Sequence, residues 1–168
     1  PGKAMGNTER IRQRTDEPDW PILFLAPEAT THYGQELLTF KTGAFVVGRP
    51  ILAALVSFPN KNFDPGWGSV GLACHLYRLF CQVYTRGAVR FLPVYFPSEE
   101  EVADPKLFAE NVRGYMANEG GLALSEFGVE HMFAMEKAGV RVGCLGRRVE
   151  GVVPSGLPTN GHNPGEGA

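Results

Sequence analysis

A polar loop with phosphate-binding chemistry lies near the start of the chain, at residues 26–31. It offers a carboxylate (Glu28), two hydroxyls (Thr30 and Thr31) and backbone N–H groups, and Lys41 follows with a compact positive charge. Ammonium, hydroxyl and N–H groups are the donors that hold a phosphate, and a carboxylate accepts from an alcohol. The loop therefore predicts a site for a small phosphorylated alcohol.

The segments around this loop are expected to place it at the edge of a sheet. The apolar run 22–25, bounded by prolines, predicts a buried strand directly before the loop. Open α/β sheets bind ligands beside the carboxyl ends of their strands. A second apolar stretch, 44–59, is interrupted at 48–50. It predicts one or two buried strands, because a membrane-spanning helix needs about 20 apolar residues.

Residues 68–85 carry apolar side chains at helical spacing, with aromatic residues beside them. This helix has two interpretations. Its apolar stripe packs on the sheet, which is the ordinary role of an amphipathic helix and the one we favour, or it contacts a bilayer interface. Residues 88–95 then predict a further strand, which Pro93 confines to an edge, a bulge or a strand end.

Helix start and stop signals follow in the second half. Ser98 and Glu101 have the spacing of a capping box, and Asp-Pro at 104–105 marks another helix start. That helix is expected to end at Gly-Gly 120–121, and a further helix is expected over 127–137. Together these segments predict an α/β fold, a mixed β-sheet flanked by helices.

Composition excludes several classes of function. The chain has 168 residues, 43% of them hydrophobic, which is enough for a sizeable core. A net charge of -2 without a basic cluster argues against nucleic-acid binding. Three widely spaced cysteines indicate reduced thiols, and no second ligand pair closes a metal site. Gly-x-Ser-x-Gly and phosphate-loop patterns are both absent, which disfavours hydrolases and phosphoryl transferases.

The order of the motifs along the chain is itself informative. Pro-Glu-x-Thr at 27–30, Phe-Lys-x-Gly-Ala-Phe at 40–45 and Pro-Ile at 50–51 are followed by the segments 91–101 and 104–113. This order resembles the glycerolipid acyltransferases that act on lysophospholipids, and specifically the lysophosphatidylcholine acyltransferase branch. The resemblance covers roughly residues 8 to 140, which is most of the chain.

The resemblance implies a set of substrate-binding residues, at the acyl acceptor and in the pocket wall: Glu28, Ala29, Thr30, Thr31, Lys41, Pro50 and Ile51. Ala29 departs from the family pattern, which has glycine at this position. If the backbone there is left-handed, the Cβ atom costs on the order of 1 kcal/mol. We expect this alanine to reshape the loop or to weaken binding.

The family's catalytic pair is a His-x-x-x-x-Asp block upstream of Pro-Glu-Gly-Thr, in which the imidazole deprotonates the alcohol and the carboxylate orients the imidazole. None of the four histidines here is followed at that spacing by aspartate. His131 and Glu136 have the spacing, but on a helix that step places them on different faces, so we interpret them as structural. No catalytic residue is assigned, and we expect the chain to be the latter part of an acyltransferase with its general base and membrane anchor upstream.

The hypothesis divides the chain into a polar N-terminal segment (1–20), the C-terminal part of an acyltransferase domain (21–140) and an extension with a disordered tail (141–168). The resemblance implies acyl transfer from acyl-CoA, as co-substrate and without a cofactor or metal, to the free hydroxyl of a lysophospholipid. It also implies association with a membrane surface, at the endoplasmic reticulum with the domain facing the cytosol. The alternative is a non-catalytic lipid-binding pseudoenzyme or fragment, which Ala29 favours.

Overall fold

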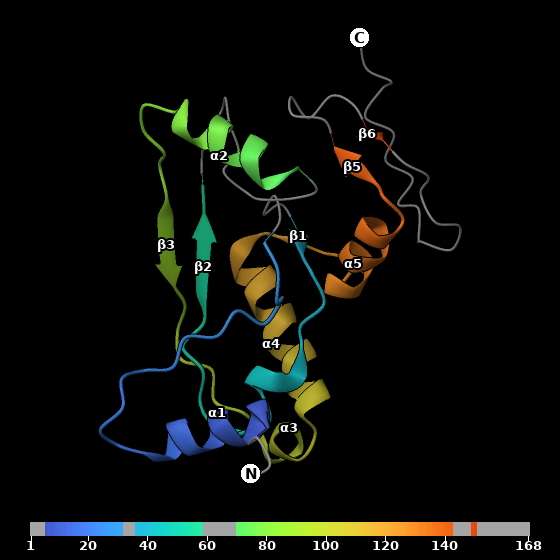
Figure 1. Cartoon of the computed structure of the whole chain (residues 1–168). Helices are drawn as coiled ribbons and strands as arrows, with labels where there is room; N and C mark the ends of the chain where they lie inside the picture. Colours follow the sequence, from blue (N-terminus) through green and yellow to red (C-terminus); the bar gives the residue numbers. More distant parts are fainter. Residues whose placement is uncertain (1–5, 32–35, 59–69, 143–148, 151–168) are drawn as a thin grey trace, which may run out of the picture.

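The computed structural model describes residues 6–31, 36–58, 70–142 and 149–150 (Figure 1). The helices are α1 (Asn7–Asp16), α2 (Leu72–Phe80), α3 (Glu99–Ala103), α4 (Pro105–Gly120), α5 (Val129–Lys137) and the 3-10 helix η1 (Thr42–Ala44). The strands are β1 (Glu36–Leu37), β2 (Ala54–Ser57), β3 (Ala88–Phe91), β4 (Ala123–Leu124), β5 (Arg141–Val142) and β6 (Val149–Glu150). The predicted α/β class is confirmed.

Parallel and antiparallel pairing are both present, distributed over two-stranded sheets within the described residues. β1 pairs in parallel with β4, whereas β2 with β3, and β5 with β6, are antiparallel. Beyond β3 the ladder breaks at Pro93 and resumes as a single bridge between Ile51 and Tyr95. This break is the one expected of proline, which has no N–H to donate to a ladder.

The core is built on α4, which lies at the centre of the molecule (Figure 1). Phe108 and Val112 are its most deeply buried side chains, and the Phe45 ring meets Phe108 edge to face, with centroids 5.2 Å apart. Further buried apolar side chains complete this cluster: Leu37, Phe40, Ala53, Leu92, Ala109, Met116 and Ala117. The segments 37–45, 51–55 and 92–95 are therefore fixed around one helix rather than on a broad sheet.

The predicted boundaries of α3 and α4 are confirmed. The Glu101 N–H donates to the Ser98 hydroxyl while the Ser98 N–H donates to the Glu101 carboxylate, which completes the capping box. The Asp104 carboxylate accepts from the first turn of α4, with Pro105 at the first helical position. Gly121 ends α4 with a φ of 62°, a left-handed conformation that glycine adopts readily.

Other predictions were wrong in detail. Residues 22–25 form no strand, and the side chains of Ile22 and Phe24 are 90% and 79% exposed. The stretch 44–58, predicted to form one or two buried strands, contains one strand, β2, which is not buried: Val56 is exposed. The helix expected over 127–137 begins at Val129. Most of the predicted extension and tail (141–168) lies outside the described residues, and the three-part division of the chain stays a prediction.

The buried carboxylate of Glu101 joins the start of α3 to α4. It accepts hydrogen bonds from the Tyr95 hydroxyl at 2.7 Å and from the Asn111 amide at 2.8 Å. Burial by itself would raise the pKa of Glu101, but the bonds from Ser98, Tyr95 and Asn111 outweigh it and lower this pKa. Burial, followed by the bond to Glu101, raises the pKa of Tyr95 to about 12.

Arg113 is the buried cation of α4, with 6% of its surface exposed. Its guanidinium donates to the carbonyl of Leu38 at 2.8 Å, to that of Leu37 at 3.0 Å, and to that of Ser125. Glu110, one turn earlier on α4, pairs with it at 3.2 Å. Arg113 therefore ties the parallel pair β1–β4 to the central helix.

We predict that Arg113→Met lowers the free energy of unfolding by about 3 kcal/mol, because it leaves several main-chain carbonyls without their donor. Urea unfolding followed by circular dichroism measures the change. Arg12→Met is the matched control, since Arg12 is about half exposed and forms an exposed pair with Glu9; its effect is expected to stay within about 0.5 kcal/mol. Equal effects of the two substitutions would contradict the role given to Arg113.

Candidate functional site

The polar loop is a tight turn with an unusual backbone. The Ala29 N–H donates to the carbonyl of Ala26 at 3.1 Å. Ala29 has a φ of 56° and, within the described part of the chain, is the single non-glycine residue with a positive φ. The sequence analysis expected a cost at Ala29 if its backbone were left-handed, and this conformation is present. Ala29 therefore carries a Cβ atom in a conformation that favours glycine.

Two hydrogen bonds fasten this loop to the segment that follows it. The Glu28 carboxylate accepts from the N–H of Leu38 at 2.9 Å, and the N–H of Lys41 donates to the carbonyl of Pro27 at 2.8 Å. The first bond gives Glu28 a positioning role inside the protein. The second brings Lys41 to the start of the loop, as a phosphate site there requires.

Helix α5 supplies the other contacts of the loop. The Lys41 ammonium lies 2.6 Å from the Glu130 carboxylate, and the Thr30 hydroxyl lies 3.1 Å from the sulfur of Met132. The bond from Lys41, followed by one from the backbone N–H of Glu130 itself, lowers the pKa of the Glu130 carboxyl. Both charged side chains of this pair are about half exposed. Such a pair contributes only about 0 to 1 kcal/mol, so another anion can compete for the ammonium.

The predicted site residues thus fall into two groups. Glu28, Thr30 and Lys41 are brought together by the contacts above, and Thr31 lies exposed at the end of the same loop. Ile51 exchanges two backbone hydrogen bonds of 2.9 Å with Tyr95 and packs against the core, next to the exposed Pro50. Their role as a pocket wall stays a prediction.

Sequence reasoning missed Glu130 and Met132. Both come from a helix whose existence the sequence pattern predicted, but whose position beside the loop it did not. The contacts join residues almost ninety positions or more apart in the chain. Neither residue type carries a signal for such long-range pairing.

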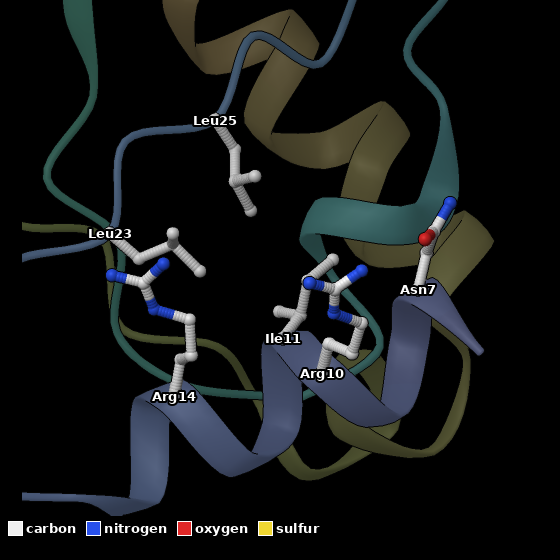
Figure 2. A pocket seen from close by; sticks show the side chains of 6 residues that line it. All are labelled: Asn7, Arg10, Ile11, Arg14, Leu23 and Leu25. Atoms are coloured by element: carbon white, nitrogen blue, oxygen red, sulfur yellow. The ribbon is translucent and has the colours of Figure 1, made fainter. Parts of the chain in front are cut away.

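Two shallow hollows lie elsewhere, along α1. The first, of about 370 Å³, is lined by Asn7, Arg10, Ile11, Arg14, Leu23 and Leu25. Figure 2 shows the arginines on α1 and the leucines on the facing segment. Arg10 and Arg14 also line the second hollow, where the Arg14 guanidinium lies 4.2 Å from the centre of the Trp20 ring. An apolar floor beside two guanidiniums suits an anion with an apolar part, but neither hollow includes the loop.

Other candidate groups have structural roles. The Nδ1 atom of His131 accepts from the N–H of Gly128 at 3.0 Å, at the start of α5, in keeping with its structural interpretation. Cys81 is a free, exposed thiol, whereas Cys74 is disulfide-bonded, which corrects the expectation of three reduced thiols.

Within the described ranges no three His, Cys, Asp or Glu side chains gather as metal ligands. No helix in those ranges has the length and apolarity to cross a bilayer.

Comparisons with known proteins identify the class to which these features relate. The chain is 47% identical over 121 residues to the Arabidopsis thaliana lysophospholipid acyltransferase LPEAT1, covering 72% of this chain and 30% of that protein. It is 38% identical over 122 residues to the Drosophila melanogaster lysophosphatidylcholine acyltransferase, with 71% and 23% covered. It is 37% identical over 135 residues to human lysophosphatidylcholine acyltransferase 2, with 78% and 24% covered.

The chain is therefore a homologue of lysophospholipid acyltransferases, as the motifs predicted, and it spans between 23% and 30% of the length of these relatives. No protein-family model matches it, and no solved structure matches it significantly. The α/β fold described above is therefore that of a region homologous to part of these relatives.

We predict that Ala29→Gly raises the free energy of unfolding by about 0.5 kcal/mol. Relief of a left-handed strain of about 1 to 2 kcal/mol exceeds the added backbone entropy of the unfolded chain, about 0.5 to 1 kcal/mol. Ala134→Gly, at an exposed position within α5, is the control and should lower the same quantity by about 0.5 to 1 kcal/mol. Thermal and urea unfolding measure both, and a loss of stability in each variant would contradict the strain at Ala29.

Proposed function

We propose that this chain carries the acyl-acceptor-binding part of a lysophospholipid acyltransferase. The observation that supports this most directly is the convergence of Lys41 and Thr30 on one loop, fastened to the protein by Glu28. In this proposal the loop and Lys41 hold the glycerol-phosphate end of a lysophospholipid. The full reaction joins the acyl group of acyl-CoA to the free hydroxyl as an ester and releases coenzyme A as a thiol.

Binding proceeds by exchange of the partner of Lys41. A lipid phosphate is an anion, as is the Glu130 carboxylate, and the ammonium accommodates either one. The exposed Lys41–Glu130 ion pair is weak enough for a phosphate to replace Glu130. The Thr30 hydroxyl, which now contacts the sulfur of Met132, can donate to a phosphate oxygen instead. Glu28 acts on the acceptor through the loop, since its carboxylate holds the N–H of Leu38.

The chemical step needs a base to take the proton from the attacking hydroxyl. We assign none within this chain, so the chain alone binds the acceptor without turning it over. The proposed acyltransferase region is 21–140, with Pro50 and Ile51 in the wall of its pocket. Because lysophospholipids are amphiphiles of bilayers, we place the protein at a membrane, that of the endoplasmic reticulum on its cytosolic side.

One observation favours a second candidate, a non-catalytic lipid-binding module. Ala29 holds a left-handed backbone that glycine adopts without strain. A loop no longer selected for the closest approach to a reacting lipid tolerates such an alanine. Both candidates are expected to bind lipid without turnover by this chain alone. A fusion of this chain to the upstream part of a homologue, which carries the catalytic base, separates them. Acyl transfer by the fusion supports the acyltransferase, and its absence supports the lipid-binding module.

We predict that Lys41→Gln weakens the binding of monomeric, short-chain lysophosphatidylcholine by about fivefold, because one phosphate-facing charge is lost. Glu130→Gln should instead strengthen binding severalfold, since it removes the competing anion. Isothermal titration calorimetry measures both affinities. Lys106→Gln, an exposed lysine of α4, is the matched control with unchanged affinity. Weaker binding by Glu130→Gln, or equal binding by the two lysine variants, would contradict partner exchange at Lys41.

We also expect no acyl transfer from radiolabelled acyl-CoA to lysophosphatidylcholine by residues 1–168, because no general base is assigned among them. The assay separates product lipids by thin-layer chromatography, with a full-length homologue as the active control. Robust turnover by this chain would show that a catalytic base lies within it.

A further inference from the structure

Helix α2 exposes most of its large apolar side chains, whereas Leu79 is half-buried. Leu72, Leu76, Tyr77 and Phe80 are 53%, 39%, 68% and 81% exposed, and no residue of the helix is buried. The interpretation that this stripe packs on the sheet was therefore wrong. A soluble helix buries its apolar stripe, so an outward stripe needs a partner of its own.

The opposite side of α2 is less exposed. Cys74, His75 and Arg78 are half-buried, and they lie across the helix from Leu76 and Phe80. The segment after the helix continues the outward apolar surface, with Val83 99% and Tyr84 67% exposed. We call the outward side chains the α2 surface: Leu72, Leu76, Tyr77, Phe80, Val83 and Tyr84.

The charged residues in the segment that carries this surface have one sign. Residues 70–98 contain no aspartate or glutamate, whereas Arg78, Arg86 and Arg90 all lie among them, in a chain whose net charge is -2. The Arg86 guanidinium lies 5.6 Å from the centre of the Tyr84 ring, at the border of the α2 surface. Arg90 donates to the carbonyl of Glu119 and so is held against the protein.

We propose that the α2 surface binds a lipid bilayer that contains anionic lipids. Its apolar and aromatic side chains suit the boundary between head groups and acyl chains, and cations beside them are attracted to anionic head groups. Tyrosine favours this boundary because its ring is apolar and its hydroxyl is polar. The tyrosines of the surface and the cation at its border, Arg86, favour this occupant over a second copy of the chain.

The geometry sets how the helix meets the bilayer. Nine residues span about 14 Å, against a hydrocarbon core of about 30 Å, so α2 lies in the interface rather than across it. In Figure 1 it lies at one end of the molecule, before the segment that leads into β3. The proposal rests on the proposed function only in that the acceptor is itself a membrane lipid.

The test is flotation of the 168-residue chain with vesicles of phosphatidylcholine alone or mixed with phosphatidylserine, both without lysophospholipid. We expect binding to the mixed vesicles, reduced at least about tenfold by the double variant Leu76→Glu, Phe80→Glu. Arg86→Gln should reduce it by about fivefold on the mixed vesicles alone. Phe133→Glu, at an equally apolar position of α5 that is 63% exposed, is the control with unchanged binding.

Circular dichroism and thermal unfolding confirm that each variant is folded, and Arg86→Gln tests the surface without adding a charge to it. Equal binding by all variants, or no binding by the wild type, would overturn the proposal. So would a wild-type dimer that the double variant dissociates while vesicle binding persists, because a second copy would then be the occupant. Loss of lysophosphatidylcholine binding alone, with vesicle binding intact, would count against the proposed function and leave the α2 surface supported.

Discussion

The buried guanidinium of Arg113 is the interaction on which the rest of this structure depends. An arginine is costly to bury unless its donors are satisfied, and here they reach the carbonyls of Leu37, Leu38 and Ser125. Those carbonyls lie at the carboxyl ends of the two strands of a very short parallel pairing, β1 with β4. Two residues on each strand cannot hold such a pairing by themselves, so the cation from α4 supplies what a longer sheet would otherwise provide.

Leu38 connects the interactions of Arg113 to the polar loop. Leu38 offers its carbonyl to Arg113 and its N–H to Glu28, so a single residue links the central helix to the turn at 27–30. Lys41 follows on the same segment and returns to Pro27 through its backbone. The loop is therefore held by main-chain bonds, while the ammonium of Lys41 and the hydroxyl of Thr30 remain at its outer side, where α5 meets them.

Sequence reasoning predicted best what local chemistry decides. The capping box at Ser98 and Glu101 and the glycine that ends α4 involve neighbours within a few residues, and all were found where expected. The homology was likewise carried by short motifs. Which distant segments pack together was harder to predict, because the spacing of residues within one segment carries no information about its partner elsewhere in the chain. The run 22–25 has the composition of a buried strand, yet no described strand pairs with it and the side chains of Ile22 and Phe24 are exposed. Similarly, an arginine within a helical pattern reads as a surface residue, and only the packed structure shows Arg113 to be internal.

The link through Leu38 also bears on which positions can vary. Both Arg113 and Glu28 hold main-chain atoms of residues 37–38, which every amino acid except proline presents in the same way. The side chains at 37 and 38 are then chosen by the packing around them alone, and their replacement by other apolar residues leaves the linkage intact. The linkage therefore depends on the identity of two charged residues whose side chains bind the backbone, Arg113 in α4 and Glu28 in the turn.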